Sequence, residues 1–247
     1  MRLHRIFCPE LPANQSLFEL PEKQANYVGA VLRLRTDDVM HVFNGKGDEY
    51  FTRIVSVNRR HVLVALGRRI INTKESPLIV ELGQVLSRGD RMDFAIQKSV
   101  ELGVSLISPL LSERCEVKLD PHRMTKRRHH WQQIVYSASE QCGRSLTPQV
   151  RQPQALTDWL VSAEGDVKFV FHPQQTSHVN EGLHFGNQSE PDKVILLVGP
   201  EGGFSEKEVN LARQHGFQTM TLGPRILRTE TAPIVALSFV QQRWGDL

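Results

Sequence analysis

The spacing of apolar residues divides the chain into two parts of different character. Up to about residue 72, apolar residues alternate with polar ones in short runs at 39–43, 50–57 and 61–65. Alternation of period two predicts half-buried strands, and the Asn- and Gly-containing sequences between these runs are turn signals. Residues 21–33 have helical spacing instead. We therefore expect a small β-barrel interrupted by one short helix.

The second part follows a linker at 72–76 and alternates between strand and helix patterns. Short apolar runs predict buried strands, and the amphipathic runs between them predict helices that cover a sheet. The fold class expected for residues 73–247 is therefore α/β, with a mostly parallel sheet, helices on both faces and a β domain at residues 1–72 before it. The predicted strands are 78–85, 106–111, 166–171, 193–198 and 218–222, and the predicted helices are 91–102, 124–141, 205–215 and 231–243; residues 176–189 are expected to form a polar loop.

Composition excludes several classes of protein. Among 247 residues, 40% are hydrophobic and 23% are charged, which is ordinary for a globular chain and not for a disordered one. No apolar run approaches the roughly 18 residues of a membrane helix, and no apolar segment of a secretory signal follows the first residues. Cys8, Cys115 and Cys142 are far apart and form no Cys-x-x-Cys pair. We therefore expect a cytoplasmic protein with no membrane contact, no metal and no disulfide framework.

Charge is unevenly distributed along the chain. The net charge of +3 combines 11 Lys/Arg against 7 Asp/Glu in residues 1–72 with 19 against 20 in residues 73–247. A second basic cluster, interleaved with histidines, occupies residues 118–130. Clusters of this kind are typical of phosphate binding, although a simply solvated face is an equal alternative for any one of them.

Two segments that follow predicted strands carry the candidate chemistry. Residues 199–205, Gly-Pro-Glu-Gly-Gly-Phe-Ser, form a glycine-rich turn at a position where α/β proteins bind ligands. This turn lacks the Gly-Lys-Ser/Thr of a P-loop and the spacing of the dinucleotide fingerprint, which disfavours nucleoside triphosphates and NAD. Residues 222–232 form a polar loop with an apolar insert that suits an amphipathic ligand. A plain strand-to-helix turn is the alternative for the first segment.

Together these segments resemble the RsmE family of RNA methyltransferases, which belongs to the SPOUT class. Further agreement comes from Gln-Lys and Glu-Leu-Gly-Val within residues 97–104, from Glu-Gln-x-x-Arg at 140–144, and from Arg5 with residues 31–33. The resemblance covers nearly the whole chain. It implies a trefoil-knotted methyltransferase domain behind an N-terminal RNA-binding domain of PUA-like type, and a homodimer formed through the knot region.

The resemblance further implies that S-adenosylmethionine is the cofactor and that three loops bind it. Glycines in these loops let backbone groups approach a ligand closely, and apolar side chains can flank an adenine. The expected cofactor-binding residues are Phe171, His172 and Pro173 in the first loop, Gly199, Pro200, Glu201 and Gly202 in the second, and Leu222, Gly223, Arg225, Ile226, Leu227, Arg228 and Thr229 in the third, with Ala232 beside it.

The reaction of the family is methylation of uracil N3 in the decoding region of 16S ribosomal RNA in the small ribosomal subunit. The base must be exposed, and N3 must lose its proton as it attacks the methyl group. We expect Arg228 to stabilise the uracil anion; Glu201 is a candidate base, but it could equally tie its loop together, and for Glu230 a structural role is favoured. The candidates for binding RNA are Arg2, Arg5, Arg33, Arg35, Arg114 and Arg144.

Three other functions compete with this interpretation. The chain could be a non-catalytic RNA-binding assembly factor, although its intact glycines argue against a lost site. It could act on another RNA or another atom, such as a ribose oxygen of transfer RNA. A nucleotide-binding metabolic enzyme is disfavoured by the missing phosphate motif and by the basic first third of the chain.

Overall fold

The chain folds into two compact units. The computed structural model describes residues 3–12, 15–58, 60–117, 120–172 and 190–247. Unit 1 comprises Met1–Glu75 and Tyr136–Thr147, and unit 2 comprises Ser76–Val135 and Pro148–Leu247. The first change of unit therefore lies three residues beyond the predicted boundary, and residues 136–147 join the first unit. They do so through contacts with residues distant in sequence, such as the stacked rings of Phe7 and Tyr136 at 4.0 Å.

Unit 1 is built on a five-stranded sheet. Its strands are β1 (His4–Phe7), β2 (Leu17–Glu19), β3 (Val39–Phe43), β4 (Glu49–Val57) and β5 (Val62–Arg69). The order is β1-β3-β4-β5-β2, with β1 parallel to β3 and the other pairs antiparallel. The three predicted strands are confirmed, whereas β1 and β2 were not predicted from the sequence. No ladder closes β1 onto β2 among the residues that the structure describes, so the described sheet is open.

The predicted helix in unit 1 consists of two short turns, α1 (Glu22–Asn26) and the π-helical η1 (Tyr27–Val31). Ala25 and Val28 from these turns lie in the buried core of the unit, beside Met40, Val42 and Ile54 of the sheet. Alternation along the strands therefore provides one buried face, and the short helical segment covers it.

Unit 2 contains a parallel sheet of seven strands. They are β6 (Ile79–Val85), β7 (Leu106–Leu111), β8 (Gln149–Val150), β9 (Gln154–Ala155), β10 (Val167–Phe171), β11 (Lys193–Val198) and β12 (Gln218–Met220). The order is β12-β10-β11-β6-β7-β8, and β9 also pairs with β7. The five predicted strands are confirmed with ends shifted by at most two residues. The predicted polar loop at 176–189 lies outside the described residues.

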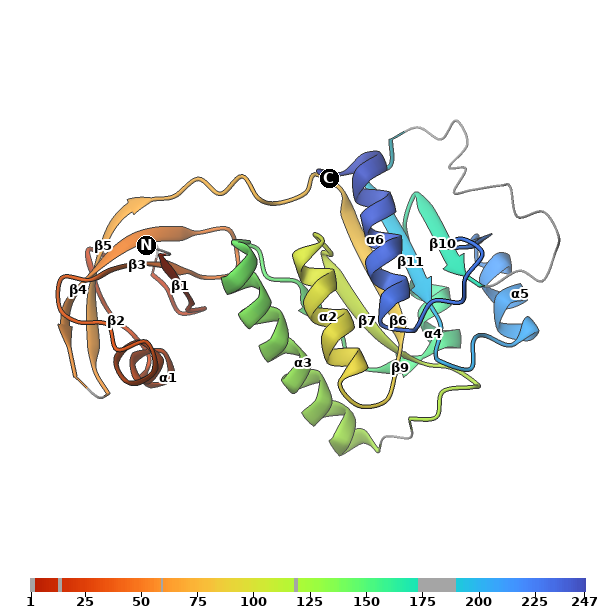
Figure 1. Cartoon of the computed structure of the whole chain (residues 1–247), viewed down its shortest axis with the longest axis horizontal. Coiled ribbons are helices and arrows are strands. Elements are labelled where there is room, and N and C mark those ends of the chain that lie inside the picture. Colours follow the sequence, from red (N-terminus) through yellow and green to blue (C-terminus); the bar gives the residue numbers. More distant parts are fainter. Residues whose placement is uncertain (1–2, 13–14, 59, 118–119, 173–189) are drawn as a thin grey trace. The chain divides into compact units, whose positions relative to one another are not determined.

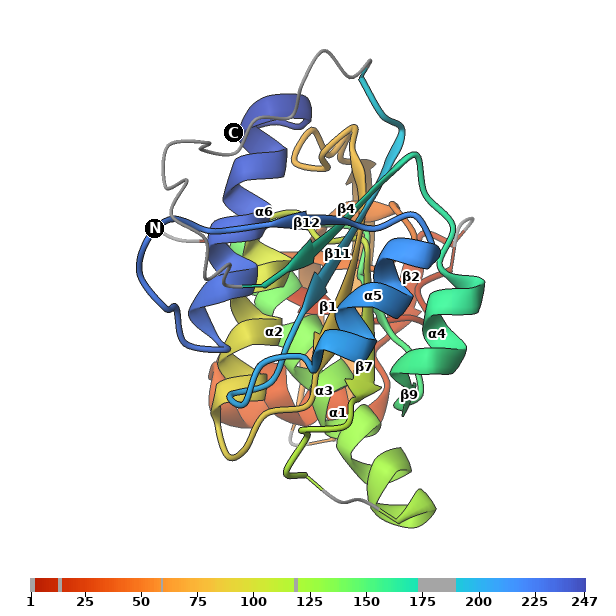
Figure 2. The ribbon, with the colours of Figure 1, turned by 90° about the vertical axis from the view of Figure 1, so that its right-hand side faces the viewer.

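Helices lie on both faces of this sheet (Figure 2). On one face α2 (Arg91–Glu101) packs beside α6 (Thr231–Trp244); on the other lie α4 (Leu156–Ser162) and α5 (Glu206–Gln214). The remaining helix, α3 (Pro121–Cys142), runs from unit 2 into unit 1 and is visible in green in Figure 1. No helix among the described residues is long and apolar enough to cross a membrane.

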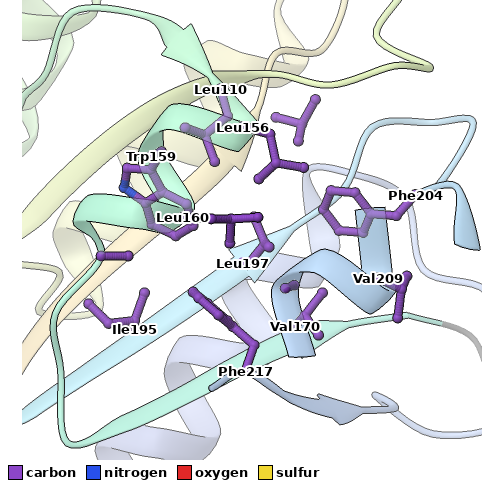
Figure 3. Packing of buried hydrophobic residues seen from close by; sticks show 13 residues of the cluster. Leu110, Leu156, Trp159, Leu160, Val170, Ile195, Leu197, Phe204, Val209 and Phe217 are labelled. Atoms are coloured by element: carbon purple, nitrogen blue, oxygen red, sulfur yellow. The ribbon is translucent and has the colours of Figure 1, made fainter. Parts of the chain in front are cut away.

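The core on the α4 and α5 side joins elements that are far apart in sequence. Trp159 and Leu160 of α4 meet Ile195 and Leu197 of the central strand β11, and Phe217 packs against the indole (Figure 3). Helix α4 was not predicted, because it is only seven residues long and has no side-chain cap. Burial of large apolar side chains here stabilises the sheet by roughly 1.5–3 kcal/mol per residue.

Candidate functional site

The predicted site loops meet at one edge of the sheet in unit 2. Because β12, β10, β11 and β6 are parallel neighbours, the loops that follow them all emerge at their carboxyl ends. A backbone hydrogen bond from His172 N–H to the Met220 carbonyl, 3.1 Å long, continues the pairing past the end of β10. The structure therefore brings His172 close to the ends of the strands from which the segments beginning at residues 199 and 221 emerge.

Thr229 joins two of these segments to strand β6. Its hydroxyl donates to the Gly199 carbonyl over 3.1 Å and accepts from the Gln84 amide over 3.2 Å. Thr229 is only 5% exposed and Gln84 only 1% exposed, so both bonds are shielded from water. Sequence reasoning missed Gln84. Its signal was a long amide near the end of a predicted buried strand, a position where burial is costly without a partner.

The glycine-rich turn is held at two further points. Glu201 accepts hydrogen bonds from the Arg91 guanidinium at 2.8 Å and from the Arg88 backbone N–H at 3.4 Å. Arg114 donates from Nη1 to the Gly202 carbonyl at 3.2 Å. After the turn, Ser205 begins α5 with a capping box, as its sequence pattern predicts. The turn is thus held by the side chain of Arg91, at the start of α2, and by that of Arg114, in the loop after β7.

These contacts bear on the two roles considered for Glu201. Its Oε1 atom accepts both of these bonds and forms the ion pair with Arg91, so the carboxylate is engaged in holding the turn. The geometry supports the loop-tying role. Arg114, expected to bind RNA, is also engaged in holding this loop.

His172 presents a buried nitrogen at the same edge. Burial, together with the positive charges of Arg213 and Arg114, lowers the pKa of His172, so its ring is neutral near pH 7. Its Nδ1 atom is buried and has no hydrogen-bond partner among the described residues. Phe171 is buried at the end of β10. Pro173 lies outside the described residues.

The third predicted loop is hydrogen-bonded at its C-terminal end and exposed to solvent in its middle. Beyond Thr229, the backbone N–H groups of Thr231 and Ala232 donate to the Arg228 carbonyl and start α6. Ile226 is 87% exposed, so in this chain alone it does not enclose a ligand, whereas Leu227 is half-buried. The Arg225 and Arg228 side chains are exposed, with no ion-pair partner in the part of the chain that the structure describes. Leu222 is half-buried, and Gly223 is exposed with φ of 89°, a conformation that favours glycine.

The other predicted RNA-binding arginines fall into two groups within unit 1. Arg33 and Arg35 are exposed on the loop between η1 and β3. Arg5 instead forms a bidentate pair with the buried Glu49, at 2.9 and 2.8 Å, and its remaining donors reach backbone carbonyls near the end of α3. Arg144 is 6% exposed and bonds Glu75. Arg2 lies outside the described residues. The guanidinium of Arg5, which we expected to bind RNA, is therefore already hydrogen-bonded within the folded chain.

An open hollow of about 490 Å³ adjoins the glycine-rich turn. It is lined by Arg88, Gly89, Asp90, Arg91, Glu116 and Glu201. Two ion pairs, Arg88 with Glu116 and Arg91 with Glu201, cross its wall. Since three carboxylates line it against two guanidiniums, the hollow is no ready anion site, and it contains only Glu201 of the predicted cofactor residues.

Unsatisfied polar atoms indicate what the loop cluster itself can bind. Gln84 Oε1, His172 Nδ1 and Glu230 Oε2 are buried without a hydrogen-bond partner among the described residues. Such atoms are rare in folded proteins and cost about 1–3 kcal/mol each, so a polar ligand at this edge would recover part of that energy. Backbone groups of the glycine-rich turn and the apolar Leu227 complete a surface that suits a polar ligand with a flat ring.

Two family models match the chain, one in each of its two parts along the sequence. An RNA methyltransferase domain matches residues 74–241, and an RNA methyltransferase PUA domain matches residues 20–66. The second match identifies the part of unit 1 that contains β3, β4 and most of β5 as a PUA domain. The first includes all the loops that form the candidate site.

Known proteins of the same kind are similar over their full length. Ribosomal RNA small subunit methyltransferase E of Buchnera aphidicola subsp. Schizaphis graminum is 38% identical over 100% of this chain and 98% of its own, and that of Bacillus subtilis is 30% identical over 90% and 89%. The crystal structure of the Neisseria gonorrhoeae enzyme of that name, bound to S-adenosyl methionine, is 37% identical with a TM-score of 0.90, covering 100% of both chains. A Legionella pneumophila protein with bound cofactor SAM is 40% identical with a TM-score of 0.93, again over 100% of both. The chain therefore belongs to the ribosomal RNA small subunit methyltransferase E family of RNA methyltransferases.

Proposed function

We propose that this chain methylates N3 of a uridine in the decoding region of 16S ribosomal RNA, with S-adenosylmethionine as the methyl donor and the assembled small subunit as substrate. The observation that carries the proposal is the hydrogen bonding of Thr229 to Gly199 and Gln84. These bonds hold the second and third predicted cofactor loops at the edge of the sheet. Membership of the family supports the reaction class.

The residues present fit this cofactor. The orphaned atoms of Gln84 and His172 offer hydrogen-bonding positions to its polar groups, and the turn from Gly199 to Gly202 offers backbone groups. When bound, S-adenosylmethionine supplies a methyl group on a sulfonium sulfur, which becomes a neutral thioether when the methyl leaves. Glu201, Arg91 and Arg114 keep the turn in place and thereby preorganise the site.

The side chains of the chain also suit a uracil anion. Uracil N3 forms the new bond to the methyl carbon and releases its proton to solvent, so negative charge develops on the ring during the reaction. The Arg228 guanidinium, exposed and without a carboxylate partner among the described residues, is available to stabilise that charge. A neutral His172 adds no competing charge nearby.

The proposal extends to the assembly of the enzyme. Exposed Arg33 and Arg35 in the PUA domain are proposed to contact RNA phosphates, and we leave Arg5 and Arg144 out of that surface because the fold uses their donors. A trefoil knot in the C-terminal segment is consistent with Thr229 lying against Gly199 and Gln84. The 87% exposure of Ile226 is consistent with a homodimer that covers it. An enzyme acting on ribosomal subunits works in the cytoplasm.

The test has two measurements: formation of N3-methyluridine by the wild-type protein, and binding of S-adenosylhomocysteine by two threonine variants. Purified protein is incubated with S-adenosylmethionine and small subunits from a strain that lacks the gene, and digested RNA is analysed by mass spectrometry. We expect wild-type protein to form N3-methyluridine. We expect Thr229→Val to bind S-adenosylhomocysteine at least about fivefold more weakly, because a lost buried hydrogen bond costs about 1 kcal/mol or more.

Thr157→Val is the matched control, since Thr157 is exposed and its hydroxyl bonds Asp158, the next residue of the same helix. It should bind the cofactor product as the wild type does. Methylation of another nucleotide or atom would overturn the reaction proposed here. Binding of S-adenosylhomocysteine with no methylation of RNA would favour the assembly-factor alternative.

A further inference from the structure

The first turns of α3 carry a strongly basic surface that the proposed site does not use. Residues 121–130 contain four Lys/Arg, three His and no Asp or Glu. Every one of them is exposed except the half-buried Met124. Figures 1 and 2 both show this end of α3 extending beyond the neighbouring helices of unit 2.

Helical geometry sorts these residues onto two faces. At roughly 100° per residue, His122, Arg123, Lys126, Arg127, His129 and His130 fall within about 160° of the helix circumference. Met124, Arg128 and the buried Trp131 lie on the opposite side. That side packs against unit 2, where Arg128 donates to the Val150 carbonyl and the Trp131 indole to Asp93. We call the six outward residues the α3 basic face.

The acids near the α3 basic face leave its central charges unpaired. Asp120 pairs with Arg123 at 3.2 Å, and Asp93 pairs with His130 at 2.7 Å. Lys126 and Arg127 have no carboxylate partner within the described ranges of the chain. Like charges held close together repel one another, and a bound polyanion relieves that repulsion. Binding also releases counterions from the polyanion, which favours association.

We infer that the α3 basic face docks the phosphate backbone of the RNA substrate, as a contact surface additional to the PUA domain. The inference rests on the proposed function for the identity of the polyanion. The face carries no apolar residue, unlike the faces of helices that bind membranes, and it is more highly charged than the cores of protein–protein interfaces. Phosphates are contacted by such Lys and Arg side chains without regard to sequence.

The test removes the two unpaired charges and measures how RNA affinity depends on salt. In Lys126→Gln/Arg127→Gln both side chains are exposed and Gln is a good helix former, so the fold should be unaffected. Binding is measured with small subunits from the strain lacking the gene and with 16S ribosomal RNA, over a range of KCl concentrations. We expect the slope of log affinity against log salt to flatten by about 1.4–1.8 for two lost phosphate contacts.

The matched control is Lys207→Gln/Arg243→Gln, which removes the same charge from exposed positions on α5 and α6. Equal slopes for the two double variants would overturn the inference, as would an altered affinity for anionic phospholipid vesicles with RNA binding unchanged. A second measurement needs no substitution: RNA should protect Lys126 from acetylation and leave Lys207 reactive. Equal acetylation of Lys126 with and without RNA would contradict the inference.

The outcomes keep this inference separate from the proposed function. Protein that binds RNA through Lys126 and Arg127 but forms no N3-methyluridine would overturn the proposed reaction alone. If the protein forms N3-methyluridine but the RNA affinities of the two double variants depend equally on salt, the docking surface alone is overturned.

Discussion

Single side chains at the site have roles that depend on partners distant in sequence. Thr229 was expected in the site because it lies in a recognisable motif, but Gln84, 145 residues earlier, was not. Similarly, Arg5 looked free to bind RNA because nothing in the sequence places it against Glu49 and the end of α3. Motifs identify residues that act through their own loop, whereas a pairing across the fold requires knowledge of the strand order.

The pair of Arg91 and Glu201 gives a prediction at this scale. Arg91→Gln frees the glycine-rich turn at one of its anchor points and should weaken S-adenosylhomocysteine binding about fivefold, corresponding to about 1 kcal/mol for a partly exposed ion pair. Titration calorimetry measures the affinity of each variant for S-adenosylhomocysteine. Arg88→Gln is the control, because the Arg88 side chain pairs with Glu116 and not with the turn. An equal loss of affinity in both variants would contradict the anchoring role of Arg91.

At the scale of elements, strands with long apolar runs were predictable and short ones were not. The run at β11 has the predicted bounds, because a strand buried in a parallel sheet favours continuous apolar residues, here Val194 to Val198. In contrast, β1 and β2 have four and three residues, and only their pairing with β3 and β5 makes them strands. Helix α3 was predicted as one element, but its assignment to two units follows from contacts and not from its own pattern.

The buried ion pair of Arg5 on β1 and Glu49 on β4, which lies beside the C-terminal end of α3, supplies a prediction about pH. Burial alone would raise the pKa of Glu49, but hydrogen bonds and charge from Arg5, with help from His41 and Asn72, hold it below the ordinary value of 4.5. A lowered pKa means that the folded state favours the ionised form. The resulting stability is fully present above pH 4.5 and is lost as pH falls through the folded value.

Glu49→Gln should therefore destabilise the protein at neutral pH by about 3 kcal/mol, because Arg5 is left buried without its counter-charge. The difference from wild type should shrink as the pH falls below 4.5, where the wild-type carboxylate also becomes protonated. Urea unfolding at several pH values measures both effects. The exposed Glu22→Gln is the control. If the loss of unfolding free energy in Glu49→Gln does not change with pH, the ion pair is not its cause.

At the scale of the whole molecule, the distribution of charge along the chain proved more informative than its total. The excess of +4 lies in residues 1–72, which contain the PUA domain, while residues 73–247 are nearly neutral but carry the α3 basic face. The two-part organisation was predictable, because barrel-like and α/β patterns differ in period. The arrangement of unpaired cations on one side of α3 was not established until the packed side of that helix was known.

We propose above all that this chain forms N3-methyluridine in 16S ribosomal RNA. The most direct measurement is mass mapping of that RNA from a strain in which the gene is deleted, before and after the gene is restored. We predict that one N3-methyluridine in the decoding region disappears on deletion and returns with the wild-type gene. An unchanged set of N3-methyluridines would contradict the claim, whatever the fold and the cofactor.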